Sequence, residues 1–309
     1  MKHRTAGAVI ICVITCVIWG FSFMFTRNVV VRINFLSLLS WRFLIAFIAF
    51  SILLVCGVFQ INLKGKKLWP LVYIAIAEPI IFFTFESMGL YLTSTTESSL
   101  MIATIPIVAM IVGIPIAKQI PTKKQAVAIV LSVIGVMIIV LGQSRRIDFN
   151  LLGYFVLLIA VISGAIFSAL SARYDQYTSV EKSFAMIVLG MIAFGSAALA
   201  RNLYLGTVKE WLLLPFQDKQ FLIAILYLGL LASVVGYVGQ HYSLSIIGLN
   251  RNASFSGVIT LTSVLAGVFI LGEKLSVSMV VGGIIILAGV YGANYFTPQR
   301  ESEKVIDNG

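Results

Sequence analysis

The stretch RNASFSGVITLTSVLAGVFILGEKL, residues 251–275, decides the fold when it is set beside TESSLMIATIPIVAMIVGIPIAKQI, residues 96–120. Each stretch starts with small and polar residues, continues as an apolar body and ends in a short charged turn. An apolar segment with late glycines follows each of them. The two stretches are offset by 155 residues in a chain of 309, which is close to half its length. This pattern indicates an internal repeat.

Apolar runs of similar length fill the rest of the chain. Hydrophobic residues make up 60% of the sequence and charged residues 11%, and the mean hydropathy is +1.03. A soluble domain is about one quarter charged, whereas runs of about 20 apolar residues match the hydrocarbon thickness of a bilayer. We therefore predict an all-α integral membrane protein with ten transmembrane helices. The predicted spans are residues 6–27, 35–56, 69–92, 96–117, 125–142, 151–173, 183–204, 221–244, 252–271 and 277–296.

Five spans in each half make the two halves opposite in orientation, so the predicted architecture is two inverted five-helix repeats. The first repeat covers residues 1–145, the second covers 146–297, and a cytoplasmic polar tail covers 298–309. Inverted repeats place a substrate site at their interface near the bilayer midplane.

The basic residues predict the orientation of the chain. With the N-terminus inside, thirteen Lys and Arg residues fall in inner connections and eight in outer ones, which places both termini in the cytoplasm. The net charge of +10 therefore indicates topology and contact with anionic lipid, rather than nucleic-acid binding. The N-terminal apolar run has no clear cleavage site and is predicted to remain as the first helix. We expect a multi-pass protein of the plasma (inner) membrane of a bacterium.

Three further stretches carry a resemblance to a known family. They are VIWGFSFMFTRNVV (residues 17–30), LLSWRFLIAF (residues 38–47) and ILGEKLSVSMVVGGIIILAGV (residues 270–290). The chain resembles the EamA-type branch of the drug/metabolite transporter superfamily over about residues 6–296. It departs from that pattern at Ala117-Lys118-Gln119, where a Gly-Glu pair is expected, and it has no second-half proline matching Pro106. The resemblance implies a ten-helix secondary carrier of small organic solutes and favours export of amino acids or related metabolites.

Two glutamates lie inside the third predicted span, in AEPIIFFTFESMG, residues 77–89. On a continuous helix, Glu78 and Glu86 are separated by about 12 Å of rise and about 80° of rotation. A carboxylate held charged at the midplane costs about 2.5–3.5 kcal/mol on insertion scales. This cost favours a functional role for the pair.

Three roles for the glutamates are consistent with the sequence. A glutamate kept neutral by desolvation could carry a coupling proton, and a charged one framed by aromatic rings could bind an organic cation. The third role is a structural pair with Arg42 or His241. We favour Glu86 because the residue at the repeat offset of 155 is His241, which suggests a proton relay between two titratable groups.

Polar stripes on three other spans indicate the walls of a cavity. With the glutamates, the predicted substrate or coupling residues are Trp19, Ser22, Glu78, Glu86, Tyr237, Gln240, His241, Asn252 and Ser256. Arg42 is predicted to be a snorkelling arginine, a gate-closing partner of a glutamate or a contact for a substrate carboxylate. Gly282, Gly283, Gly289 and Ala293 predict close packing of the last helix, with a homodimer as one use of it.

The sequence offers no motif for an enzyme, a cofactor or a metal site. It has no Gly-Lys-Ser/Thr P-loop, His-Glu-x-x-His or Gly-x-Ser-x-Gly sequence. A channel or receptor is the alternative of another class, but an inverted repeat in one chain favours alternating access. We therefore predict a secondary active transporter for small organic metabolites, with proton coupling. Uptake of an organic cation, such as a quaternary amine, is the alternative if the glutamates are charged when substrate binds.

Overall fold

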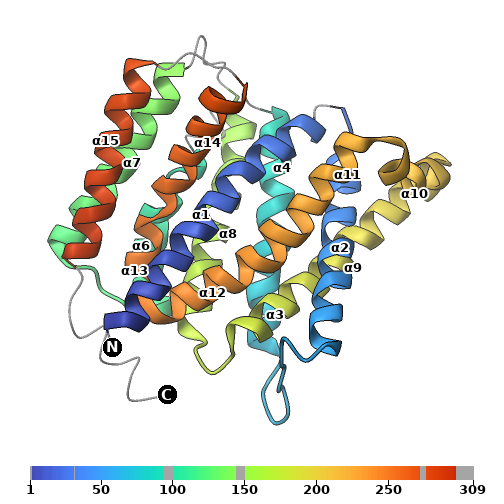
Figure 1. Ribbon diagram of the computed structural model, residues 1–309, viewed down its shortest axis with the longest axis horizontal. Helices are drawn as coiled ribbons and strands as arrows, with labels where there is room; N and C mark the ends of the chain where they lie inside the picture. The colour runs from blue at the N-terminus through green and yellow to red at the C-terminus, as the bar shows by residue number, and fades with distance from the viewer. Residues whose placement is uncertain (1, 31, 93–100, 144–149, 272–275, 297–309) are drawn as a thin grey trace.

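A computed structural model describes residues 2–30, 32–92, 101–143, 150–271 and 276–296 of the protein. These parts of the chain are mainly helical and contain no strand (Figure 1). The elements in chain order are α1 (Lys2–Val30), α2 (Phe35–Val55), α3 (Trp69–Ala75), η1 (Ile76–Ile81), α4 (Phe82–Leu92), α6 (Ile105–Ala117), α7 (Lys123–Gln143), α8 (Leu151–Arg173), α9 (Ser179–Leu205), α10 (Val208–Gln217), α11 (Lys219–Leu226), η2 (Tyr227–Val235), α12 (Gly236–Ile247), α13 (Leu249–Ser254), α14 (Ser256–Leu271) and α15 (Val277–Tyr295).

Eight segments of the described chain are long and apolar enough to cross a membrane. They are Arg4–Val30, Phe35–Val55, Trp69–Gly89, Lys123–Gly142, Leu151–Arg173, Ser179–Leu205, Lys219–Ile247 and Val277–Tyr295. The predicted all-α membrane class is therefore confirmed. The predicted count of ten depends on two shorter apolar helices, the 13-residue α6 and the 16-residue α14. The predicted tail and the predicted boundary at residue 145 lie outside the described residues.

The third predicted span is interrupted beside Glu78, where Pro79 predicts a disruption of the helix. Glu78 has extended backbone angles (φ −143°, ψ 126°), and the peptide bond to Pro79 is cis. Proline has no N–H to donate and its ring collides with the preceding turn, so the helix stops before it and restarts at Phe82. The rise and rotation calculated between Glu78 and Glu86 do not apply, because they assumed unbroken helical geometry. Ser163 of α8 donates a hydrogen bond to the carbonyl oxygen of Ala77 at this break, at 2.6 Å.

The eighth and ninth predicted spans are also less regular than expected. The eighth contains a wider π-helical stretch, η2, between α11 and α12. The ninth is divided at Phe255 into α13 and α14. The helix within the fourth predicted span, α6, begins only at Ile105, and residues 93–100 are outside the described part of the chain.

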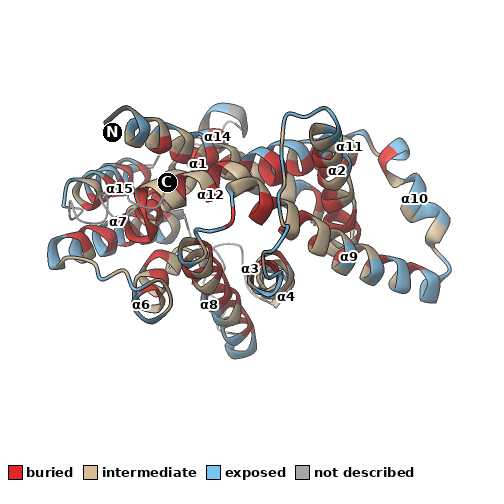
Figure 2. Cartoon of the chain, turned by 90° about the horizontal axis from the view of Figure 1, so that it is seen from below, coloured by how far each residue is buried: buried red, intermediate tan, exposed pale blue. Residues whose placement is uncertain are grey.

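The short helix α10 was not predicted. It has ten residues and connects two membrane-spanning segments, so it is too short to cross a bilayer itself. Both Figure 1 and Figure 2 show it at the edge of the helix bundle. Its Trp211 indole donates a hydrogen bond to Ser40 at 3.2 Å, and the Trp41 indole donates to the carbonyl oxygen of Trp211 at 3.1 Å. These bonds attach α10 to α2.

The small residues of α15 pack inside the chain, where our prediction suggested a homodimer as one use of them. Helices α15 and α7 lie side by side (Figure 1). A Cβ atom built at Gly282 would be 2.5 Å from the carbonyl oxygen of Gly135 on α7, and one built at Gly289 would be 2.6 Å from the amide nitrogen of Ser132. Ala293 is fully buried on the same face. A dimer through α15 would therefore need its opposite face.

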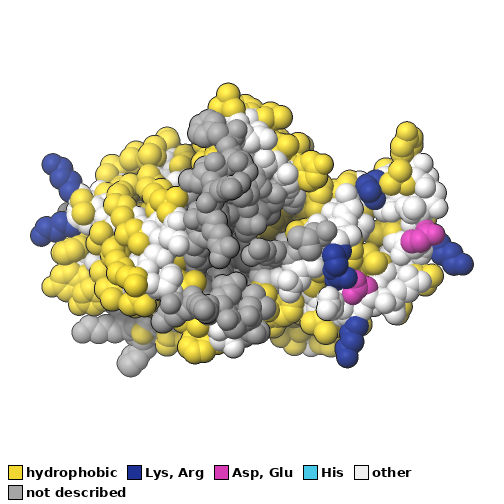
Figure 3. All heavy atoms as spheres, turned by 90° about the horizontal axis from the view of Figure 1, so that it is seen from above, with side chains coloured by type: hydrophobic (Ala, Val, Ile, Leu, Met, Phe, Trp, Pro, Cys, Tyr) yellow, Lys and Arg dark blue, Asp and Glu magenta, His cyan; other side chains and the backbone are white. Residues whose placement is uncertain are grey.

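The outer surface of the helices is apolar. Figure 2 shows buried residues where helices face one another and exposed ones on their outer sides. Large hydrophobic side chains such as Phe269, Val277 and Phe216 are about 80% exposed. In the view of Figure 3, hydrophobic side chains cover much of the described surface and charged ones are scattered. Such a surface is stable in contact with lipid and costly in contact with water.

Candidate functional site

Arg42 on α2 is the charged residue around which the predicted site is built. Its side chain is only 6% exposed, and its Nε donates a hydrogen bond to Ser233 Oγ on η2 at 2.9 Å. Its Cζ atom lies 4.6 Å from the centre of the Phe83 ring and 5.5 Å from that of Phe43. Ser233 in turn donates to the carbonyl oxygen of Leu228, at 2.9 Å. These contacts fix the guanidinium inside the bundle.

Both predicted glutamates lie near Arg42. Glu78 is close enough to interact electrostatically with Glu86 and with Arg42, and Glu86 also interacts with Arg42. Both glutamates are partly buried. Within the described residues, however, no nitrogen of Arg42 comes within 4.0 Å of either carboxylate, so the three charges form a cluster without a closed ion pair. The irregular stretch η1 positions Glu78, whereas α4 positions Glu86 one helix turn beyond Phe83.

Tyr237 on α12 completes this group, which we call the Arg42 cluster: Arg42, Glu78, Glu86 and Tyr237. The Tyr237 ring is 1% exposed, and its hydroxyl is within electrostatic range of the other three residues. No residue of the described chain forms a hydrogen bond with that hydroxyl. Trp19 packs edge-on against the Tyr237 ring, with 6.4 Å between ring centres, and donates its indole N–H to the carbonyl oxygen of Ala232 at 3.0 Å. A buried hydroxyl without a partner is uncommon in a native structure and calls for an explanation.

The other predicted cavity residues have partners of their own. Gln240 donates to the side-chain oxygen of Asn252 at 2.9 Å, and Asn252 donates to Cys12 Sγ at 3.4 Å. These bonds connect α12, α13 and α1. Ser22 and Ser256 donate to carbonyl oxygens of their own helix turns, at 2.7 and 2.9 Å.

His241 lies in an apolar setting. Its ring is 1% exposed, its Nε2 is 3.2 Å from Met186 Sδ, and its ring centre is 5.6 Å from that of Phe167. Its Nδ1 is buried without a hydrogen bond among the described residues. The structure brings together Arg42 and the glutamates, but among the described residues no hydrogen bond or ion pair joins Glu86 to His241.

Two residues of the site, Ser233 and Phe83, were not among the predicted site residues. Ser233 lies one helix turn before Tyr237 on the same polar stripe, which was a usable signal. Phe83 had no signal in the sequence, because Phe82 and Phe85 are equally close to the glutamates along the chain.

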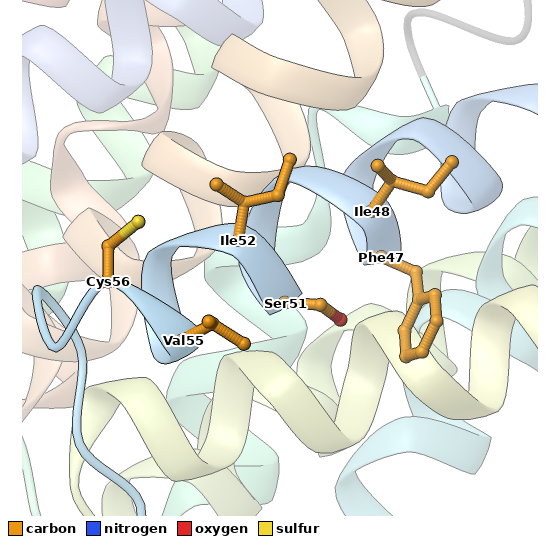
Figure 4. Close-up of a pocket in the computed structure, with 6 residues that line it drawn as sticks. All are labelled: Phe47, Ile48, Ser51, Ile52, Val55 and Cys56. Atoms are coloured by element: carbon orange, nitrogen blue, oxygen red, sulfur yellow. The ribbon is translucent and has the colours of Figure 1, made fainter.

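A separate surface hollow is apolar and lies on α2. Its volume is about 350 Å³, and it is lined by Phe47, Ile48, Ser51, Ile52, Val55 and Cys56. Figure 4 shows that all six side chains come from the last turns of α2 and the residue after it. Val55 is 88% exposed and Ile52 is 56% exposed, so this hollow belongs to the lipid-facing surface rather than to the Arg42 cluster.

No group of three or more His, Cys, Asp or Glu side chains suited to a metal ion occurs in the described ranges of the chain. The fold and the buried Arg42 cluster therefore define a helical membrane protein with a few charged groups inside the bundle. Intramembrane charges of this kind are typical of solute pathways.

Comparison with known proteins identifies the family. The EamA-like transporter family matches the chain over residues 6–141 and again over residues 151–295. The protein belongs to this family, as the resemblance predicted, and it is a multi-pass membrane transporter.

Two relatives are named as uncharacterized transporters. The uncharacterized transporter YcxC of Bacillus subtilis is 31% identical over 296 residues, and the match covers 95% of both proteins. An uncharacterized transporter of Archaeoglobus fulgidus is 24% identical over 289 residues, covering 91% of this chain and 96% of its own. A solved structure titled only "Crystal structure of protein" has a TM-score of 0.76 at 14% identity, and the match covers 96% of this chain and 98% of that one. This last likeness shows the shared fold.

Proposed function

We propose that the protein is a secondary active transporter that moves small organic metabolites, such as amino acids, out of a bacterial cell by alternating access. The single observation that carries this proposal is the Arg42 cluster, because it places three charged groups inside an apolar bundle, where each is costly. Binding of a polar solute or a proton during transport is a function that explains why the protein keeps these costly groups.

The proposed architecture adds α6 and the α13–α14 segment to the eight long spans, giving ten crossings in two inverted halves, residues 1–145 and 146–297. The cluster then draws on both halves, since Arg42, Glu78 and Glu86 come from the first and Tyr237 from the second. Inverted-repeat carriers bind substrate between their halves and expose that site by rocking. Both termini are proposed to be cytoplasmic in the inner membrane, because of the thirteen-to-eight basic bias.

Proton coupling is the second part of the proposal. Two carboxylates and one guanidinium carry a net charge of −1 when all are ionised, and one added proton makes the cluster neutral. Neutrality is strongly favoured in a medium of low dielectric constant. We propose that Glu86 or Glu78 holds this proton. Uptake of a quaternary amine is the alternative, and it requires Glu86 to be charged when the amine binds.

Flux measurements on the purified protein in liposomes test the proposal. Wild type and Glu86→Gln are compared over a panel of amino acids and quaternary amines, with and without a pH gradient. If Glu86 carries the proton, the variant keeps solute exchange and loses its response to the gradient. Loss of quaternary-amine binding by Glu86→Gln at every pH would instead support the alternative, uptake of an organic cation.

Glu210→Gln is the matched control, because Glu210 is an exposed carboxylate on α10, away from the cluster. Its flux is expected to equal that of wild type. If Glu86→Gln also matches wild type for every transported solute, Glu86 has no transport role. If wild type moves none of the solutes under any gradient, the proposed substrate class is wrong.

A further inference from the structure

We propose that Arg42 recognises a carboxylate group on the transported solute, and that the opposite, cationic end of the solute faces Glu78 and Glu86. The substrate is then a zwitterion that presents both charges to one site. This inference rests on the proposed transport function and adds to it the residue that determines specificity.

The position of Arg42 separates this role from a snorkelling arginine. A snorkelling side chain keeps its charged head in water and buries only its stem. Arg42 is 6% exposed as a whole, and its guanidinium is held by the Ser233 hydroxyl and stacked against the Phe83 ring. The head itself is therefore inside the protein.

The geometry also distinguishes carboxylate recognition by Arg42 from a gate closed by a salt bridge between Arg42 and a glutamate. A salt bridge between Arg42 and a glutamate would satisfy the guanidinium, but over the described ranges its nitrogens are more than 4.0 Å from every carboxylate. Ser233 is the one hydrogen-bond acceptor that the described residues offer to this guanidinium, and it binds Nε. Neither terminal nitrogen, Nη1 or Nη2, has a hydrogen-bond partner in the part of the chain that the structure describes.

The remaining edge of the guanidinium matches a carboxylate. Nη1 and Nη2 present parallel N–H groups that bind both oxygens of a carboxylate in a planar, bidentate arrangement. The buried Tyr237 hydroxyl, which has no hydrogen-bond partner in the described structure, lies within electrostatic range of the same guanidinium. A carboxylate bound there could accept from it as well. Two independent features, an unused guanidinium edge and an unpartnered buried hydroxyl, thus point to one anionic ligand group.

The charges of the cluster favour a zwitterion over a singly charged solute. With one proton on the glutamate pair the cluster is neutral, so a bound zwitterion keeps it neutral, whereas a simple anion would leave it at −1 and a simple cation at +1. A solute with both charges meets an opposite charge at each end. Arg42 also occupies the neighbourhood of the Phe83 ring, which reduces the aromatic surface available for an organic cation.

Ser233 is a positioning residue in this arrangement. Its hydroxyl accepts from Arg42 Nε and donates to the Leu228 carbonyl oxygen, so it sets the plane of the guanidinium from the irregular stretch η2. Its removal should loosen that plane without removing the charge. We expect Ser233→Ala to raise KM about tenfold with little change in the maximal rate.

The test uses the full chain in liposomes and three related probes: an α-amino acid that wild type transports, its methyl ester and its decarboxylated amine. Sites built to hydrogen-bond a polar group reject analogues that lack it by large factors. We expect the ester and the amine to be transported at least ~100-fold less efficiently than the acid by wild type. Arg42→Gln should abolish this preference, and Arg42→Lys should retain part of it.

Arg32→Gln is the matched control, since Arg32 is an arginine with a 45% exposed side chain that pairs with Asp218 at the end of the bundle. It should keep the preference for the acid. Binding to detergent-purified protein, measured as a ligand-induced rise in Tm, gives the same comparison for any variant that reconstitutes poorly. Equal handling of acid, ester and amine by wild type would overturn the role of Arg42 while leaving transport intact. Absence of both flux and binding for every probe would overturn the proposed function, and this inference with it.

Discussion

The contact between Lys66 and Glu181 gives a prediction whose magnitude follows from the structure. Lys66 Nζ lies 2.8 and 3.0 Å from the two carboxylate oxygens of Glu181. Glu181 also accepts backbone N–H groups of Asn62 at 3.1 Å and Thr178 at 2.9 Å. The contact joins the connection between α2 and α3 to the start of α9, which are in different proposed halves of the protein.

The expected cost of Lys66→Met lies between two limits. Breaking a fully buried ion pair costs about 3–5 kcal/mol, whereas an exposed pair contributes at most about 1 kcal/mol. The Glu181 side chain is 1% exposed and that of Lys66 is 29% exposed, and the two backbone N–H groups remain after the substitution. We therefore expect a loss of about 2 kcal/mol in the free energy of unfolding, or about 3 °C in Tm.

A double-mutant cycle with Lys66→Met and Glu181→Gln, followed by unfolding of the purified protein, measures the coupling between the two side chains. Lys67→Met is the control, because Lys67 is the exposed neighbouring lysine and should change stability by no more than about 0.5 kcal/mol. A coupling energy below about 0.5 kcal/mol would refute the reasoning, since it would place the pair with ordinary surface contacts.

Five further substitutions, at four positions, test local geometry by thermal unfolding. Lys118 has a left-handed backbone (φ 55°) at the end of α6, so Lys118→Gly should stabilise the protein by about 1 kcal/mol. Gly282→Val should destabilise it by about 1–3 kcal/mol through overpacking against α7, whereas Gly195→Ala, with no atom within 4 Å of the new Cβ, should be stabilising. Asp218→Ala removes the N-cap of α11 and should lower the free energy of unfolding by about 1 kcal/mol. Asp218→Asn should retain most of the stabilisation by the cap, because the asparagine side-chain oxygen accepts the same backbone N–H groups. The Phe221 backbone N–H, then the Arg32 guanidinium, lowers the pKa of Asp218, so its contribution should persist above an unfolded-state pKa of about 3.9 and disappear as the pH falls through the lower folded-state value.

Hydrophobic pattern alone was sufficient to predict the long spans. The run Leu151–Arg173, for example, is one helix whose single charged residue is its last one. The pattern failed where local chemistry overrides hydropathy. Pro79 breaks the third span, and α10 combines Lys209 and Glu210 with apolar residues, which made it look like a loop.

The sequence predicted which residues belong to the candidate site but not which of them contact one another, because the contacting residues are far apart along the chain. A buried guanidinium needs partners, and the sequence offered Glu78 and Glu86 as reasonable ones for Arg42. The hydrogen-bond partner in the structure is Ser233, 191 residues away, and that contact depends on how η2 packs against α2. The hydrophobic periodicity of a sequence does not predict which residues of two distant helices will contact each other.

The use of Ser233 has a physical consequence for what the cluster can do. Had either glutamate formed the salt bridge, the guanidinium would be neutralised internally, and a solute would have to displace a strong interaction to bind. A neutral hydroxyl on Nε holds Arg42 in place without neutralising it, and the Nη edge stays available at full charge. The carboxylates of the two glutamates lie more than 4.0 Å from the Arg42 nitrogens, so they lower the cost of burying the guanidinium charge without forming a salt bridge to it. Because Arg42 and the glutamates are close together but unpaired, a ligand with both charges can bind them without first breaking a salt bridge. The dependence of transport on the carboxylate of the solute is therefore the decisive property to measure.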